Sequence, residues 1–333
     1  MSAKPRVLVV GTGGTIHSVG KDRLDIVRYG ENGVKHGIEE LVGAVPEASQ
    51  VAETIPVVFD TQPSPFIGPE IWINLVEAIH AAVAEHQPDG VVVTHGTAVL
   101  EETAYFLNLT LKVDVPVVVV GSQRPISGIS TDGEINLVNA IRVAAHPDSR
   151  GLGVLVMLND EIQASRDVTK TSTLRMQTFR TADFGVLGHA DADTISYYRR
   201  PLRAGSPDTE FSVKAGDVLP RVDIALSYAG NDGAAIDAYV AAGAQGIVSA
   251  AFAPGGVTAQ EKEALDSASD AGVVLMLSTR AGSGRVVEST GLNRPEGIIP
   301  ADNLIPQKAR ILLMLALTVT KDPAEIRRIF ATY

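Results

Sequence analysis

Two threonines in this sequence follow apolar runs and are flanked by glycine. The run Val7–Val10 leads into the segment GTGGT, which ends at Thr15. Catalytic groups of open α/β sheets gather at the carboxyl ends of strands, so Thr15 stands where a hydroxyl can do chemistry. Gly13 and Gly14 would let the backbone turn sharply and a substrate come close. The alternative is that Thr15 only bonds a nearby backbone group, as turn threonines commonly do.

A phosphate-binding role for the same glycine loop fails on two counts. The dinucleotide fingerprint needs a third glycine where this chain has Ile16, and no helical periodicity follows it. The P-loop needs Gly-Lys-Ser/Thr after its glycines, and this sequence does not follow that pattern. No nucleotide cofactor is therefore expected, and the loop alone leaves the catalytic and the structural alternatives for Thr15 open.

The second threonine, Thr97, follows the buried run Val91–Val93 in the stretch VVVTHGTAVLEETAYFL. Thr97 is either a catalytic hydroxyl or the N-cap of the helix predicted to start near Leu100, and this stretch alone leaves both open. His95 is interpreted as a hydrogen-bonded structural residue, because no second histidine or carboxylate stands at metal-ligand spacing. No metal site is predicted.

Lys170 is the third candidate for chemistry. It lies in the stretch NDEIQASRDVTKTSTLRMQTF, which follows the apolar run GVLVML and shows no apolar alternation around the lysine. A partly buried lysine can activate a hydroxyl. The alternative is a solvated loop lysine, which is the common case because most lysines are exposed.

The elements that must position these residues alternate between strand and helix patterns. The runs RVLVV, PVVF, GVVVTHG, PVVVVG and GVLVML are apolar on both faces, as parallel strands covered by helices on both sides must be. Apolar spacing predicts helices over Pro69–Glu85, Leu100–Leu111 and Gly133–Ala145. The predicted fold class is α/β, with a larger N-terminal, mostly parallel sheet flanked by helices and a smaller C-terminal α/β domain.

A change of composition over Tyr197–Val222 separates two domains, because proline, glycine and charge accumulate there without periodicity. We predict a catalytic domain over 1–200, a linker over 201–220 and a smaller domain over 221–333. The runs VDIALSY, GIVSAA and GVVLML predict three more strands in the smaller domain. Its helices are predicted over Gly233–Ala242, Thr258–Ala271, Lys308–Thr320 and Pro323–Tyr333.

Composition favours a protein that acts on small molecules. The chain has 333 residues, 45% of them hydrophobic, and a net charge of -11 without a Lys/Arg cluster, so neither nucleic acid nor an anionic membrane is an expected partner. The absence of cysteine excludes disulfides and thiolate metal sites. The N-terminal apolar run is short, and Ile311–Val319 is about half of the roughly twenty residues that a membrane span needs. A cytoplasmic protein is predicted.

Taken together, these segments resemble the bacterial-type asparaginase family. The stretches GTGGTI, THGTAVLEETAYFLNLT, VPVVVVGSQRP, STDGEINLVNA, SRDVTKTST and IPQKARILLMLALTVTKDPAEIRRIF occur in the order of that family and span nearly the whole chain. The resemblance implies an amidohydrolase that needs no cofactor and acts on asparagine, glutamine or a related carboxamide. It also implies a homotetramer of intimate dimers, in which the neighbour's second domain completes each active site.

The resemblance implies catalytic roles for four residues. Thr15 corresponds to the acylated nucleophile, and Tyr29, on the flexible segment that follows, corresponds to an assisting tyrosine. Thr97 and Lys170 correspond to a second catalytic pair.

The implied substrate-binding set is Ser64, which would hold the substrate carboxylate, together with Gly14, Gly96 and the position of Ala98. At this last position family members that hydrolyse asparagine usually have aspartate, in the motif HGTD. They also commonly have glutamine after the serine, where this chain has Pro65, and the segment FAPGG has no asparagine equivalent to that of a GNGN-like loop. All three departures remove groups that would bind an α-ammonium.

These losses bear on the substrate, because an α-ammonium without a carboxylate partner in a closed pocket costs on the order of several kcal/mol. Either another acid replaces the aspartate, with Glu288 or Glu296 of a neighbouring subunit as candidates, or the substrate has no free α-ammonium. The second alternative is favoured. Loss of the acid beside Lys170 should also lower the pKa of that lysine.

Two further interpretations compete with the enzyme. A non-catalytic ligand-binding or regulatory protein on the same fold would explain the missing aspartate, but the retention of Thr15, Thr97 and Lys170 argues against it. The tRNA-dependent amidotransferase subunit that shares the fold would need an additional N-terminal domain, and the sequence begins at the first predicted strand.

Overall fold

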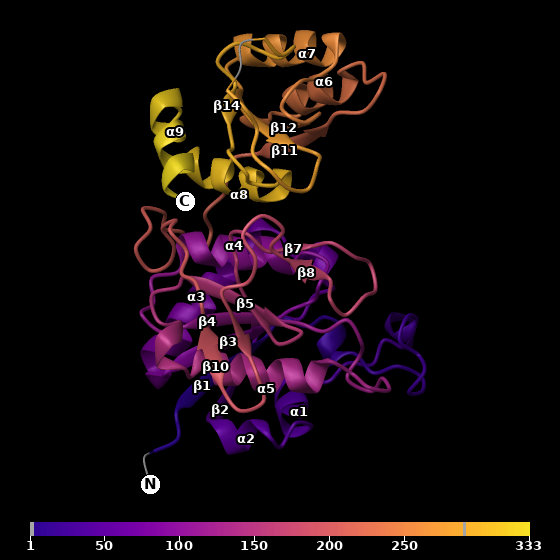
Figure 1. Ribbon diagram of the computed structural model, residues 1–333, viewed down its shortest axis with the longest axis vertical. Coiled ribbons are helices and arrows are strands. Elements are labelled where there is room, and N and C mark those ends of the chain that lie inside the picture. Colours follow the sequence, from indigo (N-terminus) through magenta and orange to yellow (C-terminus); the bar gives the residue numbers. More distant parts are fainter. Residues whose placement is uncertain (1–2, 289–290) are drawn as a thin grey trace. The chain divides into compact units, whose positions relative to one another are not determined.

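The computed structural model describes residues 3–288 and 291–333 and divides into two compact units, Met1–Asp217 and Val218–Tyr333. Figure 1 shows the elements of each unit in the order in which the chain forms them. Each unit has its own sheet and its own apolar core, so each is described by itself.

The first unit is built on a sheet that has eight strands within the described residues, in the order β10-β9-β6-β5-β4-β3-β1-β2. Five of them run parallel: β1 (Arg6–Gly11), β2 (Glu53–Val58), β3 (Gly90–Thr94), β4 (Val117–Val120) and β5 (Val154–Leu158). The remaining three add antiparallel pairs at one edge: β6 (Glu161–Ala164), β9 (Gly188–Ala190) and β10 (Ile195–Tyr197). A separate two-stranded ribbon joins β7 (Thr169–Lys170) to β8 (Phe179–Arg180).

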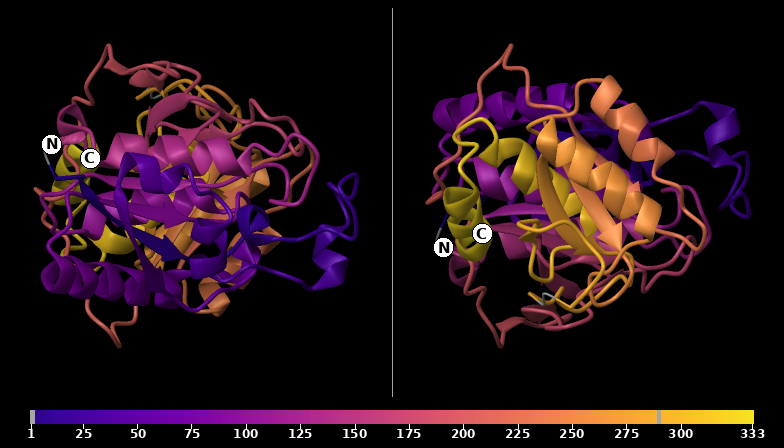
Figure 2. Two further views of the ribbon diagram at one scale, coloured as in Figure 1. Left: turned by 90° about the horizontal axis from the view of Figure 1, so that it is seen from below. Right: turned by 90° about the horizontal axis from the view of Figure 1, so that it is seen from above.

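Helices cover both faces of this sheet, which is why its central strands are apolar throughout. On one face α5 (Gly133–Ala144) contacts β3, β4 and β5, next to α1 (Ile38–Gly43) and α2 (Ala48–Val51). On the other face α3 (Pro69–His86) and α4 (Leu100–Thr110) pack together, contacting β1, β4 and β5. Figure 2 shows α3 and α5 on opposite sides of the strands. Short 3-10 turns complete the unit: Thr15–His17, Tyr29–Asn32, Ser64–Phe66 and Pro147–Ser149.

The second unit has a wholly parallel sheet in its described residues, ordered β11-β12-β13-β14. Its strands are β11 (Val222–Leu226), β12 (Gly246–Ala251), β13 (Val274–Thr279) and β14 (Ile299–Pro300). The helices are α6 (Ala234–Ala241), α7 (Ala259–Asp270), α8 (Pro306–Ala316) and α9 (Pro323–Thr332). A capping box fixes the start of α7, because the Thr258 hydroxyl accepts from the Glu261 N–H while the Glu261 carboxylate accepts from the Thr258 N–H.

The α/β fold class predicted from the sequence is confirmed, and the predicted helices agree with the observed ones to within a few residues. The apolar stretch Ile311–Val319 begins inside the buried part of α8. No helix in the part of the chain that the structure describes is long and apolar enough to cross a bilayer. The segment predicted as a linker packs largely on the first unit: Phe211 is buried there, and the Ser206 N–H donates to the Asn108 carbonyl at 2.8 Å.

Close packing of α5 on β3 depends on Gly90. A Cβ added at this glycine would lie 2.1 Å from the backbone oxygen of Ala144 in α5. We expect Gly90→Ala to lower the free energy of unfolding by about 3 kcal/mol, because neither backbone segment can move without disturbing the core. The measurement is urea denaturation followed by circular dichroism. Gly43→Ala is the matched control, since nothing lies within 4 Å of a Cβ there, and equal midpoints for the two variants would contradict the prediction.

Candidate active site

The glycine loop after β1 meets the loop after β3. Gly13 and Gly14 have φ angles of 97° and 96°, which side-chain-bearing residues rarely adopt. A Cβ on Gly14 would lie 2.3 Å from the Cα of Gly96, so the two backbones approach as closely as glycine allows. The register places Gly11 of β1 opposite Thr94 of β3, which brings the two loops to the same end of the sheet.

Thr15 forms the first hydroxyl pair of this region. It begins the 3-10 turn that follows Gly14, and its Oγ1 lies 2.8 Å from the Tyr29 hydroxyl. Tyr29 begins the next 3-10 turn, on a segment whose two ends are paired where the Val19 N–H donates to the Val34 carbonyl at 3.0 Å. The structure therefore brings together Thr15 of the first strand loop and Tyr29 of the segment that follows it, the two residues that the family resemblance pairs.

Thr97 and Lys170 form the second pair. The Lys170 ammonium donates to the Thr97 Oγ1 at 2.7 Å, and Thr97 is 7% exposed. Lys170 ends the short strand β7, whose pairing with β8 fixes the direction of the lysine. Burial lowers the pKa of Lys170, and the charge of Glu101 partly opposes that shift.

Glu101 is a site residue that the sequence analysis missed. It is buried, accepts hydrogen bonds from the Lys170 backbone N–H and from the Thr169 hydroxyl (3.1 Å), and stands in the first turn of α4. An acidic residue at a helix N-terminus is ordinarily explained by the helix dipole. The signal for a deeper role is its position four residues after Thr97.

Ser64 adjoins both glycine loops. It is 8% exposed and begins the 3-10 turn Ser64–Phe66, and a Cβ on Gly96 would lie 2.6 Å from its Cβ and Oγ. Ala98 follows Thr97 and is exposed, as are Pro65 and Phe66 after Ser64. Two of the three positions at which the chain departs from the family pattern, Ala98 and Pro65, thus lie on exposed turns beside buried site residues.

The acids suggested to replace the missing aspartate belong to the second unit. Glu288 and Glu296 are both exposed, and Glu288 forms an ion pair with Arg327 at 3.2 Å. Within residues 3–288 and 291–333, no group of three or more histidine or acidic side chains is arranged to hold a metal ion.

Comparison with known proteins identifies the family. The model named Asparaginase, N-terminal, matches residues 6–203, and that of the Glutaminase/Asparaginase C-terminal domain matches residues 221–330. The chain belongs to the asparaginase family. An L-asparaginase 2 of Bacillus subtilis (strain 168) is 42% identical over 329 residues, covering 99% of this chain and 87% of the relative. An L-asparaginase 2 of Escherichia coli (strain K12) is 39% identical, with coverage of 99% and 94%.

A solved structure from the same family has nearly the same fold as this asparaginase-family chain. It is a probable cytoplasmic L-asparaginase from Campylobacter jejuni, with a TM-score of 0.93, 38% identity and coverage of 99% of this chain and 100% of that one. The predicted resemblance to the asparaginase family is therefore confirmed.

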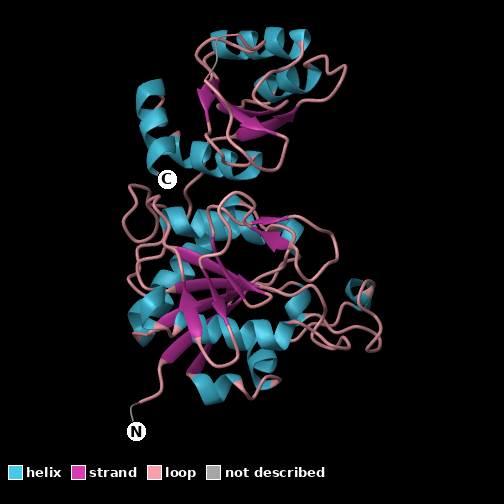
Figure 3. Cartoon of the chain, viewed as in Figure 1, coloured by secondary structure: helices cyan, strands magenta, loops and turns pink. Residues whose placement is uncertain are grey.

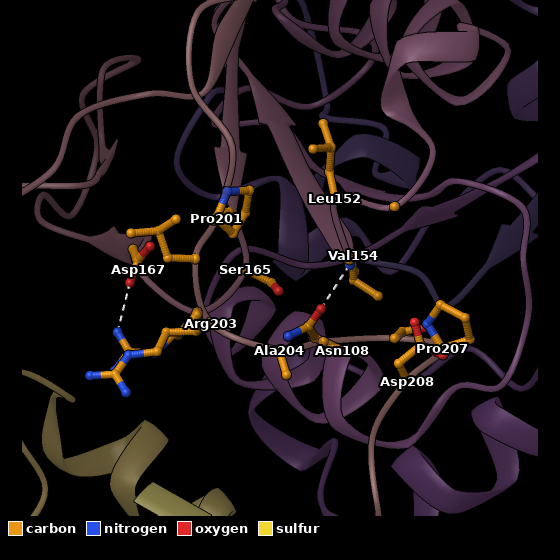
Figure 4. Close-up of a pocket in the computed structure, with 17 residues that line it drawn as sticks. Asn108, Leu152, Val154, Ser165, Asp167, Pro201, Arg203, Ala204, Pro207 and Asp208 are labelled. Atoms are coloured by element: carbon orange, nitrogen blue, oxygen red, sulfur yellow. Dashed lines mark hydrogen bonds and ion pairs between the residues drawn. The ribbon is translucent and has the colours of Figure 1, made fainter. Parts of the chain in front are cut away.

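One cavity of the first unit is not lined by any of the predicted site residues. It has a volume of about 260 Å³. Figure 4 shows its walls, which come from the start of β5, the segment after β6 and the residues around Pro207. The Asn108 side chain joins these walls, because its Oδ1 accepts from the Val154 N–H at 2.9 Å while its backbone carbonyl accepts from Ser206. Asn108 therefore links two walls of the cavity through hydrogen bonds, which is a structural role.

His95 lies fully buried behind the loop that carries Thr97. Its Nδ1 is 2.7 Å from the Gly96 carbonyl, which only accepts, so Nδ1 carries the proton. Its Nε2 is 2.9 Å from the Thr103 hydroxyl, which also accepts from the Trp72 indole N–H at 2.8 Å. Burial lowers the pKa of His95 to about 4. This hydrogen bonding agrees with the structural role predicted for His95.

Protonation of His95 should therefore oppose folding in mild acid. Between its ordinary pKa of 6.5 and the folded value of about 4, the unfolded chain binds the proton and the folded chain does not. The free energy of unfolding should fall as the pH drops through this window, by about 1.4 kcal/mol per pH unit and about 3 kcal/mol in all. Urea denaturation at pH 7, 6, 5 and 4 measures it. His95→Asn, which cannot titrate here, should show a correspondingly shallower loss, and parallel curves would contradict the assignment.

Proposed function

We propose that this asparaginase-family protein hydrolyses the side-chain carboxamide of asparagine, glutamine or a related compound through an acyl-enzyme on Thr15. The observation that supports it is a pair of hydroxyl contacts at neighbouring strand ends. Thr15 lies 2.8 Å from the Tyr29 hydroxyl, and Thr97 lies 2.7 Å from the Lys170 amine. Each threonine thus has a proton carrier within hydrogen-bonding distance, as nucleophilic catalysis requires.

In the proposed first step, the Thr15 oxygen attacks the amide carbon of the substrate. The threonine proton passes through the Tyr29 hydroxyl to the amide nitrogen, the carbon–nitrogen bond breaks and ammonia leaves. The ester on Thr15 then reacts with water, whose proton is taken by the Thr97–Lys170 pair. Release of the acid returns a proton to Thr15. A lysine with a lowered pKa suits this role, because a larger fraction of its amine is unprotonated at neutral pH.

The tetrahedral intermediate needs donors for its oxyanion. No hydrogen bond within the described part of the chain uses the backbone N–H groups of Gly96 or Thr97. Gly14 and Gly96 carry no side chain, which lets the two loops lie against each other, and we propose that they contact the substrate through their backbone groups. Ser64, buried beside Gly96, would hold the substrate carboxylate.

The substrate is proposed to lack a free α-ammonium. Ala98 and Pro65 are exposed and offer no charge beside the site. The buried acid nearby, Glu101, already accepts from the backbone and side chain of the β7 strand. Glu288 already pairs with Arg327. An N-acylated asparagine, or its analogue without the amino group, would bring no cation in need of a buried partner.

We further propose a homotetramer with shared active sites and a cytoplasmic location. The tetramer rests on the family resemblance alone, and native mass spectrometry tests it. Location is proposed from the likeness to the Campylobacter jejuni protein, which is named cytoplasmic; a relative in Haemophilus influenzae, 39% identical, is named periplasmic.

Thr15→Ala is expected to abolish ammonia release while leaving the thermal unfolding temperature nearly unchanged, because the hydroxyl is the acylated group and a loop threonine packs little. The measurement is ammonia release from asparagine, glutamine, N-acetylasparagine and succinamate. Near-normal turnover in the variant would exclude Thr15 as nucleophile. If the unmodified protein released no ammonia from any of these compounds, the non-catalytic interpretation would gain instead.

Thr97→Val and Lys170→Met should each lower kcat by about a thousandfold or more, and the double variant should lose little beyond that, because residues that act as one unit are not additive. Steady-state kinetics of the three variants measure the coupling. Losses that multiply in the double variant would show that the two residues act independently.

Ala98→Asp should reverse the order of substrates. A charge-assisted contact to a desolvated ammonium is worth about 2–3 kcal/mol, so asparagine should gain some thirty- to hundredfold in kcat/KM relative to N-acetylasparagine and succinamate. The comparison is made with the same three substrates in both forms. Strong preference for asparagine in the unmodified enzyme, with no gain from the aspartate, would mean that a different acid supplies the charge.

A further inference from the structure

His17 is a buried imidazole that the proposed chemistry does not use. It is 0% exposed and ends the 3-10 turn that begins at Thr15. Its Nδ1 lies 3.0 Å from the His36 carbonyl, and its Nε2 lies 2.7 Å from the Thr94 hydroxyl at the end of β3. One side chain therefore ties the Thr15 turn to two segments distant in sequence.

The hydrogen bonds fix the protonation of the ring. The His36 carbonyl can only accept, so Nδ1 carries the proton and Nε2 accepts from the Thr94 hydroxyl. Burial lowers the pKa of His17, which favours this neutral form. The Thr94 hydroxyl has a second possible acceptor, the Val10 carbonyl at 3.2 Å. The contact of the ring with the His36 carbonyl is made by the Nδ1–H group alone.

The His36 contact lies at the base of the segment that carries Tyr29. The two ends of this segment are paired, because the Val19 N–H donates to the Val34 carbonyl at 3.0 Å and the His36 N–H donates to the His17 carbonyl at 2.8 Å. Between these ends the chain makes an excursion of loops and a short helical turn, drawn in indigo at the edge of the first unit in Figure 2 and as loops with one helical turn in Figure 3. We name residues 20–33 the Tyr29 excursion.

The Tyr29 excursion has few other attachments. Its first half is held by the Gly20 N–H to the Ser127 hydroxyl at 2.8 Å and by the Ile129 N–H to the Arg23 carbonyl at 2.7 Å. In its second half, Gly30 and Gly33 face open space, because nothing lies within 4 Å of a Cβ added at either glycine. The position of Tyr29 over Thr15 thus depends strongly on the base.

We propose that His17 is a positioning residue for catalysis, which holds the base of the Tyr29 excursion through the His36 carbonyl and so keeps the Tyr29 hydroxyl against Thr15. The inference rests on the proposed role of Tyr29. In this proposal the hydrogen bond from Nδ1 to the His36 carbonyl positions Tyr29, and the hydrogen bond between Nε2 and Thr94 does not.

Two substitutions separate the two ring nitrogens. In His17→Asn the amide nitrogen lies where Nδ1 was, so the contact to His36 is retained and Thr94 can donate to Val10 instead. In His17→Gln the amide oxygen lies where Nε2 was, so the contact to Thr94 is retained and that to His36 is lost. We expect kcat/KM to fall about tenfold in His17→Gln and to stay within about threefold of normal in His17→Asn, as expected for one buried hydrogen bond. Equal losses in both variants, or the opposite order, would overturn the proposal.

A second measurement separates positioning from stability and does not need activity. Lys21, Arg23 and Arg28 are exposed on the excursion, so limited trypsin digestion with mass spectrometry reports its opening. Cleavage there should be about tenfold faster in His17→Gln than in His17→Asn, with unchanged cleavage elsewhere. Faster cleavage throughout the chain, or none at these sites, would contradict a role at the base of the excursion.

Combination with Tyr29→Phe distinguishes this inference from the proposed function. If His17 acts through Tyr29, His17→Gln should cause no further loss in the Tyr29→Phe background. An independent tenfold loss there would overturn the proposal. A Tyr29→Phe variant with normal turnover would instead contradict the role of Tyr29, and the trypsin comparison would still show whether His17 holds the excursion.

Discussion

The contact between Gly14 and Gly96 is the constraint on which the rest of the site depends. A Cβ on Gly14 would lie 2.3 Å from the Gly96 Cα, and a Cβ on Gly96 would lie 2.6 Å from Ser64. Only glycine permits three chain segments to meet this closely at the carboxyl end of the sheet. Because the backbones touch, Thr15 and Thr97 reach the same region from neighbouring strands, and each brings its own proton carrier. Parallel pairing of β1 with β3 provides the alignment, and the glycines provide the approach.

Burial and charge are balanced around Lys170. Taking its amine out of water lowers its pKa, which frees the amine to act as a base, while the carboxylate of Glu101 opposes that shift. The same carboxylate accepts from the Lys170 backbone, so it also fixes the strand that carries the lysine. One buried acid therefore fixes the strand that carries Lys170 and partly offsets the effect of burial on the pKa of that lysine. The missing aspartate predicts a lowered pKa for Lys170; in the structure the pKa is lowered by burial, and the charge of Glu101 opposes that shift.

The sequence predicts what depends on local pattern and misses what depends on distant contacts. The parallel strands follow from runs that are apolar on both faces, and Thr15, Thr97 and Lys170 follow from their places after such runs. Strands β6, β9 and β10 are short and antiparallel, and no pattern of apolar residues predicts them. Glu101 was missed because an acid in a first helical turn has an ordinary explanation. His17 was missed because its partners, His36 and Thr94, are 19 and 77 residues away in sequence. Phe211, in a segment with the composition of a linker, is buried, which its local sequence does not indicate.

Catalysis and recognition are carried by different kinds of structure in this protein. The hydroxyls proposed to be catalytic stand on loops at strand ends, where a change of residue would disturb the glycine contact or the hydrogen bonds of His17 and His95. Pro65 and Ala98 stand on exposed turns beside those loops and make no hydrogen bond through their side chains. A substitution at an exposed turn alters the charge offered to a substrate without altering the buried pairs. This separation gives a physical reason why the family's catalytic residues are retained here while the acid expected to bind an α-ammonium is absent.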